Sequence, residues 1–79
     1  MFQNNNMISE EDKLQKFGKN IAKYRKMKHL SQNQLAEMLD ISREHLAKIE
    51  TARRGVSFSL LFKLCDTLDI LERDLFDFQ

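Results

Sequence analysis

A short predicted helix in the middle of the 79-residue chain carries several charged side chains on one of its faces. At about 100° per residue, Leu46 and Ile49 define the buried side of this helix. The opposite side carries Arg43, Glu44, Ala47 and Lys48. Arginine and lysine donate to guanine O6 and N7, glutamate accepts from cytosine N4, and alanine permits close approach or contact with a thymine methyl. These four residues are therefore candidates for contact with base edges.

Each of these side chains also has a simpler alternative role. Glu44 lies in the first turn of its helix, where the helix dipole favours a carboxylate, and it could instead orient Arg43. Arg43 and Lys48 could contact only phosphates, which would add affinity and salt dependence without sequence discrimination. Further candidates for phosphate contact flank the helix: Ser42, Thr51, Arg53 and Arg54. The alternative for the arginine pair is a solvated turn.

The distribution of charge is compatible with a polyanionic partner. The chain has 13 Lys and Arg residues, 12 Asp and Glu residues, and a net charge of +1. Residues 13–55, however, carry a net charge of +7, whereas residues 56–79 carry −3. A basic middle segment is either a polyanion-binding face or an ordinary solvated surface. Charge alone does not decide between these two interpretations.

Composition argues against several other classes of protein. Cys65 is the sole cysteine, so the chain has no internal disulfide and fits a reducing compartment. The N-terminal sequence MFQNNNMISEED is not a signal peptide, and no apolar run approaches the ~18 residues of a membrane span. We expect a soluble, cytoplasmic protein without a membrane partner. Glycine-rich phosphate loops and zinc-binding motifs are missing, so we expect no enzymatic activity, metal or other cofactor.

Five helices, with no strands, are predicted to position these residues. Residues 1–8 are expected to form a flexible arm, and residues 9–79 one all-α domain. In the first helix, apolar residues recur at helical spacing from Leu14 to Tyr24, after a capping-box pattern that begins at Ser9. Basic residues near Lys28 favour the end of this helix, because cations stabilise a helix C-terminus.

Serines are predicted to begin the next three helices. Ser31 begins a capping box, and Ser42 caps the helix that carries the base-reading candidates. Ser57 caps a fourth helix with a continuous apolar stripe, and Asp69 ends it. A short fifth helix is expected over residues 72–77.

These motifs together resemble the phage repressor/Cro-type, or XRE-like, helix-turn-helix family. The matching segments are FGKNIAKYR, LSQNQLAEML, IS-x-x-x-L-x-x-IE and SFSLLFKLCDTLDILERDLF. They extend from about Phe17 to Phe76. The resemblance implies a five-helix, lambda-repressor-like DNA-binding domain whose third helix enters the major groove of double-stranded DNA. The small Ala36 lies where the second and third helices of such a motif approach closely.

The resemblance also assigns roles outside the third helix. Gln32 matches a family glutamine that contacts phosphate and supports the recognition helix. Arg25 and Glu50 match a pair that forms an ion pair between the first helix and the end of the third, and we interpret this pair as structural.

The chain departs from the family pattern at several helix ends. His29 and Asp40 stand where glycine is usual, because the chain turns there with positive φ, a conformation that His and Asp tolerate. Thr51 and Ala52 replace a more typical Asn-Gly or Arg-Gly pair, so the third helix is expected to extend further. Leu71 replaces the usual serine or threonine cap of the fifth helix.

Members of this family usually bind palindromic DNA as two-fold dimers. The candidates for a homodimer interface are Phe58, Phe62, Leu71, Phe76 and Phe78, although these side chains could instead close the core of their own domain. We expect no effector domain for a small molecule, which suits a small phage or plasmid repressor or a restriction-modification controller. The competing interpretation is a protein-interaction module, such as the antitoxin half of a toxin-antitoxin pair.

Overall fold

A computed structural model describes residues 8–79, and within them it contains five α-helices and no strands. The helices are α1 (Glu10–Met27), α2 (Gln32–Leu39), α3 (Arg43–Glu50), α4 (Phe58–Leu68) and α5 (Glu72–Leu75). The predicted all-α, five-helix architecture is confirmed. Residues 1–7, which make up most of the expected N-terminal arm, lie outside the described residues. Between residues 8 and 79 no helix has both the length and the apolar character needed to cross a membrane.

A serine hydroxyl caps the N-terminus of each of the first four helices. In each case the serine Oγ accepts a hydrogen bond of 3.0–3.1 Å from the backbone N–H three residues later. Such a cap contributes about 1 kcal/mol to helix stability. Ser31 completes a capping box, because its own N–H donates to Gln34 Oε1 at 2.8 Å. Helix α5 has no serine cap. There the Asp74 carboxylate supplies one of the two hydrogen bonds of a capping box, because it accepts from the Leu71 N–H at 2.9 Å.

The first four helices also end alike, each followed by a residue in the left-handed region. These residues are His29, Asp40, Ala52 and Asp69, with φ between 55° and 64°. After α3, for example, the Arg53 N–H donates to Lys48 O at 2.8 Å and the Ala52 N–H to Ile49 O at 3.2 Å. This is the hydrogen-bond pattern of a Schellman motif, which usually places glycine at the left-handed position.

Two expected helix ends were wrong. The third helix ends at Glu50 instead of extending, because Ala52 adopts the left-handed conformation with φ 64°. The turn usual in the family is therefore kept without its glycine, at a cost of roughly 1–2 kcal/mol for an L-residue with a Cβ. The fifth helix ends at Leu75, two residues earlier than expected.

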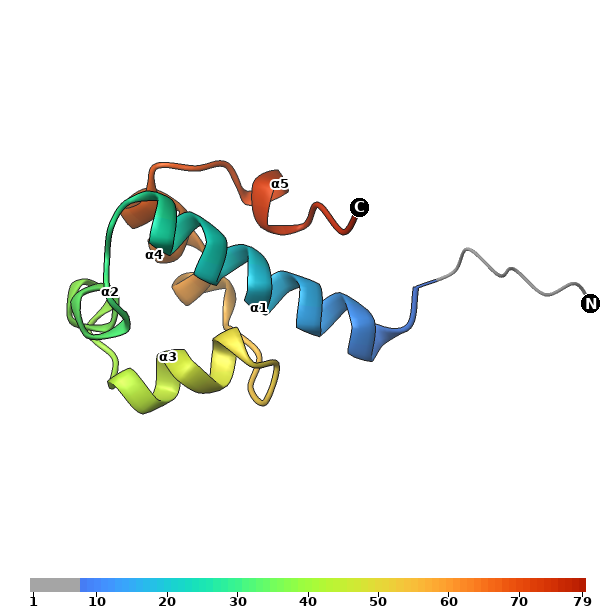
Figure 1. Cartoon of the computed structure of the whole chain (residues 1–79), viewed down its shortest axis with the longest axis horizontal. Helices are drawn as coiled ribbons and strands as arrows, with labels where there is room; N and C mark the ends of the chain where they lie inside the picture. Colours follow the sequence, from blue (N-terminus) through green and yellow to red (C-terminus); the bar gives the residue numbers. More distant parts are fainter. Residues whose placement is uncertain (1–7) are drawn as a thin grey trace, which may run out of the picture.

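The helices enclose a single apolar core around α1. In Figure 1, α1 crosses the middle of the fold, with α3 below it, α2 at its left end and α5 above it. Helix α1 packs against α3 and α5, while α2 packs against α3 and α4. The fully buried side chains include Ile21, Leu35, Leu46, Ile49, Leu64, Leu68 and Leu75. The core therefore fixes α2 and α3 against the rest of the chain.

Gly18 allows α1 to contact the end of α3 through the backbone. A Cβ at this position would lie 2.5 Å from Glu50 O and 2.6 Å from Ile49 O. Helical periodicity does not reveal this contact, although a glycine inside an amphipathic helix is a recognised sign of close packing. Gly18 thus sets how near the third helix lies to the first.

The C-terminal segment is fastened to α1 by polar and aromatic contacts. The Lys16 Nζ donates to Phe78 O at 2.9 Å, and the Asn20 side chain donates to Leu75 O at 3.0 Å and to Asp77 O at 2.9 Å. The ring of Phe76 lies 5.3 Å from that of Phe17, centroid to centroid. These contacts close the apolar core on the side opposite α3.

Replacing Gly18 with alanine is expected to lower the free energy of unfolding by about 1–2 kcal/mol. Overpacking costs up to ~3 kcal/mol when backbone must move, and alanine regains ~1 kcal/mol of helix propensity. Chemical denaturation measures this change. Gly55→Ala is the matched control, because a Cβ at Gly55 meets nothing within 4 Å. Equal stability of the two variants would contradict the close contact.

Candidate nucleic-acid interface

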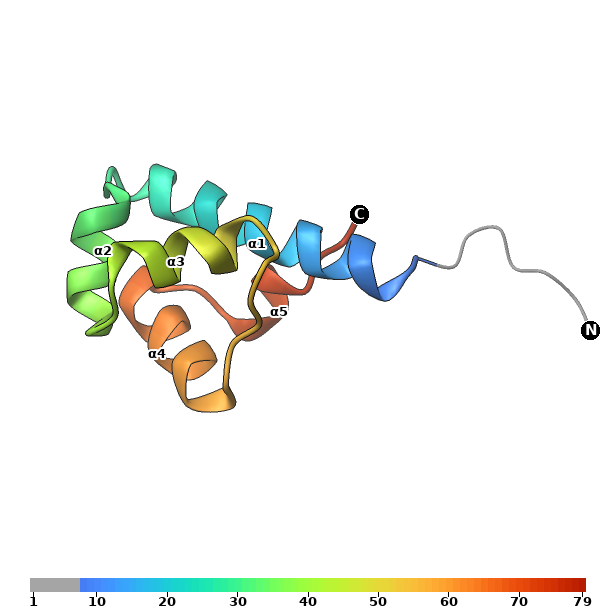
Figure 2. The same ribbon diagram turned by 90° about the horizontal axis from the view of Figure 1, so that it is seen from below.

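The outer face of α3 is left uncovered by the other described elements. Figure 2 shows α2 at one end of α3 and α4 along one side. Arg43, Glu44 and Lys48 are exposed there, and Ala47 is half-buried. Leu46 and Ile49 on the opposite face are fully buried. The structure therefore brings the four base-reading candidates onto one accessible helical surface.

A buried ion pair holds the C-terminal end of this helix. The Arg25 Nε donates to Glu50 Oε2 at 2.7 Å and the Nη2 to Glu50 Oε1 at 3.1 Å. Only 10% of the Arg25 side chain and 5% of the Glu50 side chain are exposed. The Arg25 Nη1 also donates to Leu30 O at 2.9 Å. One guanidinium thus joins α1, the turn that follows it, and the end of α3.

Gln32 extends this group of hydrogen bonds to the outer face of α3. Its Nε2 donates to Glu50 Oε1 at 2.9 Å, and its Oε1 accepts from Arg43 Nη1 at 3.3 Å. The resemblance assigned Gln32 to phosphate contact and to support of the recognition helix, but it did not give these two partners. The bridge could not be read from spacing, because it joins the starts of α2 and α3 to the end of α3.

The phosphate-contact candidates lie at both ends of α3, and all four flanking residues are exposed. Ser42 Oγ accepts from the His45 N–H at 3.0 Å, which leaves its hydroxyl proton for another acceptor. The Thr51 hydroxyl instead donates to Ala47 O at 2.8 Å. Arg53 and Arg54 follow in the turn after α3. The free donors are therefore Ser42 and the two arginines.

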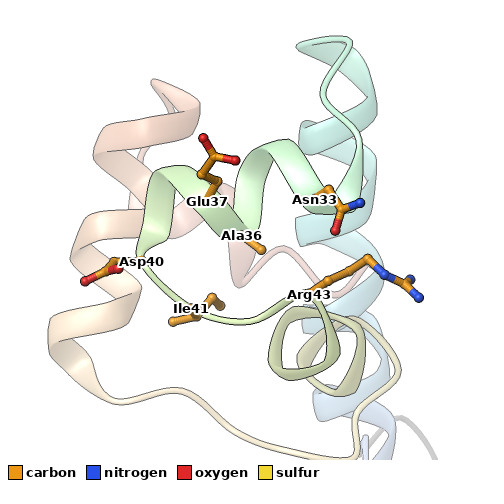
Figure 3. A pocket seen from close by; sticks show the side chains of 6 residues that line it. All are labelled: Asn33, Ala36, Glu37, Asp40, Ile41 and Arg43. Atoms are coloured by element: carbon orange, nitrogen blue, oxygen red, sulfur yellow. The ribbon is translucent and has the colours of Figure 1, made fainter.

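A pocket lies between α2, the turn that follows it and Arg43 at the start of α3. It has a volume of about 460 Å³ and is lined by Asn33, Ala36, Glu37, Asp40, Ile41 and Arg43. Figure 3 shows the Arg43 guanidinium extending away from this pocket, while the carboxylates of Glu37 and Asp40 lie along α2 and its end. Because these carboxylates repel phosphate, the pocket side of α2 is a poor surface for DNA.

The structure separates the candidates for the homodimer interface into exposed residues and residues that pack against their own domain. Phe58 and Phe62 on α4 are 78% and 52% exposed, and their rings stack with centroids 6.3 Å apart. Leu71 is also exposed. Phe78, in contrast, packs against the core and lies 6.1 Å from the Phe76 ring, so it takes the alternative role of closing its own domain. Phe76 is half-exposed and packs on α1.

Cys65 has no reactive character. The thiol is buried in the core, with 2% of the residue exposed. Burial, and then the nearby carboxylates of Glu72 and Asp66, raise the pKa of Cys65 to about 11. The thiol is therefore protonated at neutral pH, whereas nucleophilic cysteines need the thiolate.

Comparisons with known proteins agree with this geometry. A model of the helix-turn-helix family matches residues 21–75. The restriction-modification controller protein C.AhdI from Aeromonas hydrophila is 38% identical, with a TM-score of 0.75, over 80% of this chain and 96% of that chain. A search of curated proteins gave no significant match.

Two further solved structures have the same fold. The clp gene regulator ClgR from Corynebacterium glutamicum is 28% identical, with a TM-score of 0.72, over 77% of this chain and 79% of that chain. The hypothetical transcription factor NHTF from Neisseria is 21% identical, with a TM-score of 0.78, over 95% of this chain and 84% of that chain. At that identity, the second likeness concerns the fold alone.

Glu50→Leu is expected to lower the free energy of unfolding by about 3–5 kcal/mol, because it leaves the Arg25 guanidinium buried without its partner. The double variant Arg25→Met/Glu50→Leu should recover much of this loss, since apolar residues of similar volume often replace a buried pair at little cost. Denaturant titration of both variants measures the effect. A double variant as unstable as Glu50→Leu would show that the loss does not come from an unpaired charge.

Proposed function

Since this chain belongs to the XRE-type helix-turn-helix family of DNA-binding transcription regulators, we propose that it binds a palindromic operator as a homodimer, with α3 in the major groove. The observation that carries the proposal is the outer face of α3. Its exposed Arg43, Glu44 and Lys48 lie opposite two fully buried residues. An α-helix held in this way fits the width of the major groove. The family and its regulator relatives point to a non-enzymatic role.

Arg43 is the first choice for direct base reading. A guanidinium can donate two hydrogen bonds to guanine O6 and N7. The hydrogen bond that Arg43 donates to Gln32 Oε1 supports this role, because it restrains a long side chain before DNA binds and so reduces the entropy lost on binding. Glu44 and Lys48 lie further around the same face, and the half-buried Ala47 leaves room for a base edge or a thymine methyl.

Phosphate contacts would fix the position of α3 in the groove without reading sequence. Ser42 lies at one end of α3, and Arg53 and Arg54 lie beyond the other. Thr51 is the weaker candidate, because its hydroxyl proton is already donated to Ala47 O. Gln32 could still reach a phosphate, but it would then give up its bond to Glu50 or Arg43.

The dimer interface that we propose is centred on Phe58 and Phe62, with Leu71 nearby in sequence on the chain leading to α5. Two stacked phenylalanines on one exposed helical face leave a large apolar area in water. Burying apolar surface gains about 25 cal/mol per Å² of area removed from water. Pairing with the same surface of a second copy would bury them around a two-fold axis. A dimer would also present two α3 helices to successive half-sites.

The type of regulator that we favour is a restriction-modification controller. The relative C.AhdI carries that description, is 38% identical, and is matched over 96% of its own length. A fold of this size is therefore sufficient for such a controller. The sequence of the operator is an outcome of the experiment below.

Selection from a random DNA library is expected to enrich an inverted repeat with half-sites about one helical turn apart. Arg43→Ala should then cost about 1–3 kcal/mol, confined to operators that carry the base it reads. The matched control is Arg53→Ala, which should weaken binding to all sequences. It should also reduce the slope of log K against log salt concentration by about 1, because one phosphate contact is lost. No enrichment, with only weak salt-sensitive binding, would favour the protein-interaction module instead.

The double variant Phe58→Ala/Phe62→Ala is expected to be monomeric at concentrations where the wild-type chain is a dimer, because these two side chains supply the apolar centre of the interface. Analytical ultracentrifugation at tens of micromolar, with and without operator, measures this difference. Met38→Ala is the matched control, since Met38 on α2 is 51% exposed. A wild-type chain that sediments as a monomer in both conditions would rule out the dimer.

A further inference from the structure

Helix α1 and the end of α3 flank a small cavity that none of the base contacts proposed for α3 uses. The cavity has a volume of about 240 Å³ and is lined by Gln15, Lys19, Glu50 and Thr51. One water molecule occupies roughly 30 Å³ of liquid, so the cavity has room for a group the size of a phosphate. Three of its four lining residues are exposed, and the cavity is therefore accessible from solvent.

The cavity borders the C-terminal end of the outer face of α3. Gly18 holds the backbone of α1 against the last carbonyls of α3 at this point. At about 100° per residue, Gln15 and Lys19 project from the same side of α1, about 40° apart. By the same count, Thr51 falls near the middle of the outer face of α3. The N-terminal half of α1 continues beyond the end of α3 (Figures 1 and 2). The cavity thus stands beside the helix that we place in the major groove, where the phosphates of a groove wall run.

Lys19 supplies this cavity with a cation that the fold does not use. Within residues 8–79 the one ion pair joins Arg25 and Glu50, so no carboxylate of this part of the chain pairs with Lys19. Lys16, in contrast, already donates to a backbone carbonyl of the C-terminal segment. The carboxylate of Glu50 does not oppose an anion in the cavity, because both of its oxygens accept hydrogen bonds from Arg25.

The acidic first turn of α1 lies too far away to cancel the charge of Lys19. Asp12 is seven residues before Lys19, a span of about 10 Å along the helix. At physiological salt the Debye length is about 8 Å, so this distance screens exposed charges from each other. Gln15 lies between them and is uncharged, and its amide carries two N–H donors. The cavity therefore combines one positive charge with hydrogen-bond donors.

We propose that Lys19 and Gln15 bind a phosphate of the DNA backbone at this cavity, beside the end of α3. This inference rests on the proposed function. The Lys19 ammonium neutralises the phosphate and the Gln15 amide donates to one of its oxygens. Thr51 forms a wall of the site and no donor, because its hydroxyl proton is given to Ala47 O. Helix α1 thereby fixes the position of α3 in the groove through the DNA as well as through the core.

The test compares variants of the full chain on a labelled mixed-sequence DNA duplex, because a phosphate contact does not depend on base sequence. Fluorescence anisotropy at several salt concentrations gives the slope of log K against log salt concentration. Lys19→Ala should reduce this slope by about 0.9. Between about 50 and 200 mM salt, the wild-type chain should then lose about threefold more affinity than the variant. Lys19→Arg should restore the slope, and Gln15→Ala should weaken binding without changing it.

Lys13→Ala is the matched control for the loss of one positive charge from α1. Lys13 is also exposed, but it projects about 120° away from Lys19, on the side where Asn20 binds the C-terminal segment. This variant should keep the wild-type slope. A Lys19→Ala variant with the wild-type slope, or equal reductions in Lys19→Ala and Lys13→Ala, would overturn the inference and leave the proposed DNA binding intact.

Neutral methylphosphonate linkages, placed one at a time in the selected operator, give an independent measurement. One linkage in each half-site should weaken binding by the wild-type chain and leave the affinity of Lys19→Ala unchanged. If every linkage weakened both chains equally, Lys19 would have no phosphate partner and the inference would fail. A chain that binds neither duplex at any salt concentration would overturn both the inference and the proposed function.

Discussion

The ion pair between Arg25 and Glu50 is the interaction on which the position of α3 depends. It connects α1, the turn at Leu30 and the last residue of α3, and through Gln32 it also reaches α2. A buried pair gains little net stability, because the cost of removing two charges from water offsets their attraction. Its value here is geometric, since each donor and acceptor is satisfied in a single arrangement of the helices.

Close packing beside this ion pair adds a second constraint. Gly18 brings the backbone of α1 against the carbonyls of Ile49 and Glu50. A fixed distance there and a fixed orientation at Arg25 leave α3 little freedom to tilt. The same end of α3 carries the Schellman turn at Ala52. Strain at Ala52 is tolerated because the surrounding contacts over-determine the turn.

The surfaces that we propose for DNA and for a second copy lie on separate parts of the fold. The outer face of α3 combines cations with one carboxylate, whereas Phe58 and Phe62 form an apolar surface on α4. The carboxylates of Glu37 and Asp40 occupy a third region along α2 and its end. Such separation allows one small chain to approach a polyanion with one face while leaving a different face for a second copy. The net charge of +1 conceals this division.

The five helices, their serine caps and the face of α3 that carries Arg43 and Lys48 could be predicted from the sequence, because capping and helical periodicity are local properties. The sequence also indicated the turns at His29 and Asp40. Long-range contacts decided that Gln32 bridges Glu50 and Arg43, that Gly18 meets the end of α3, and that Phe78 packs against the core of its own domain. They also decided the end of α3, where packing overrode the conformational preference of Ala52. These features depend on contacts between residues far apart in the chain, which neither spacing nor propensity encodes.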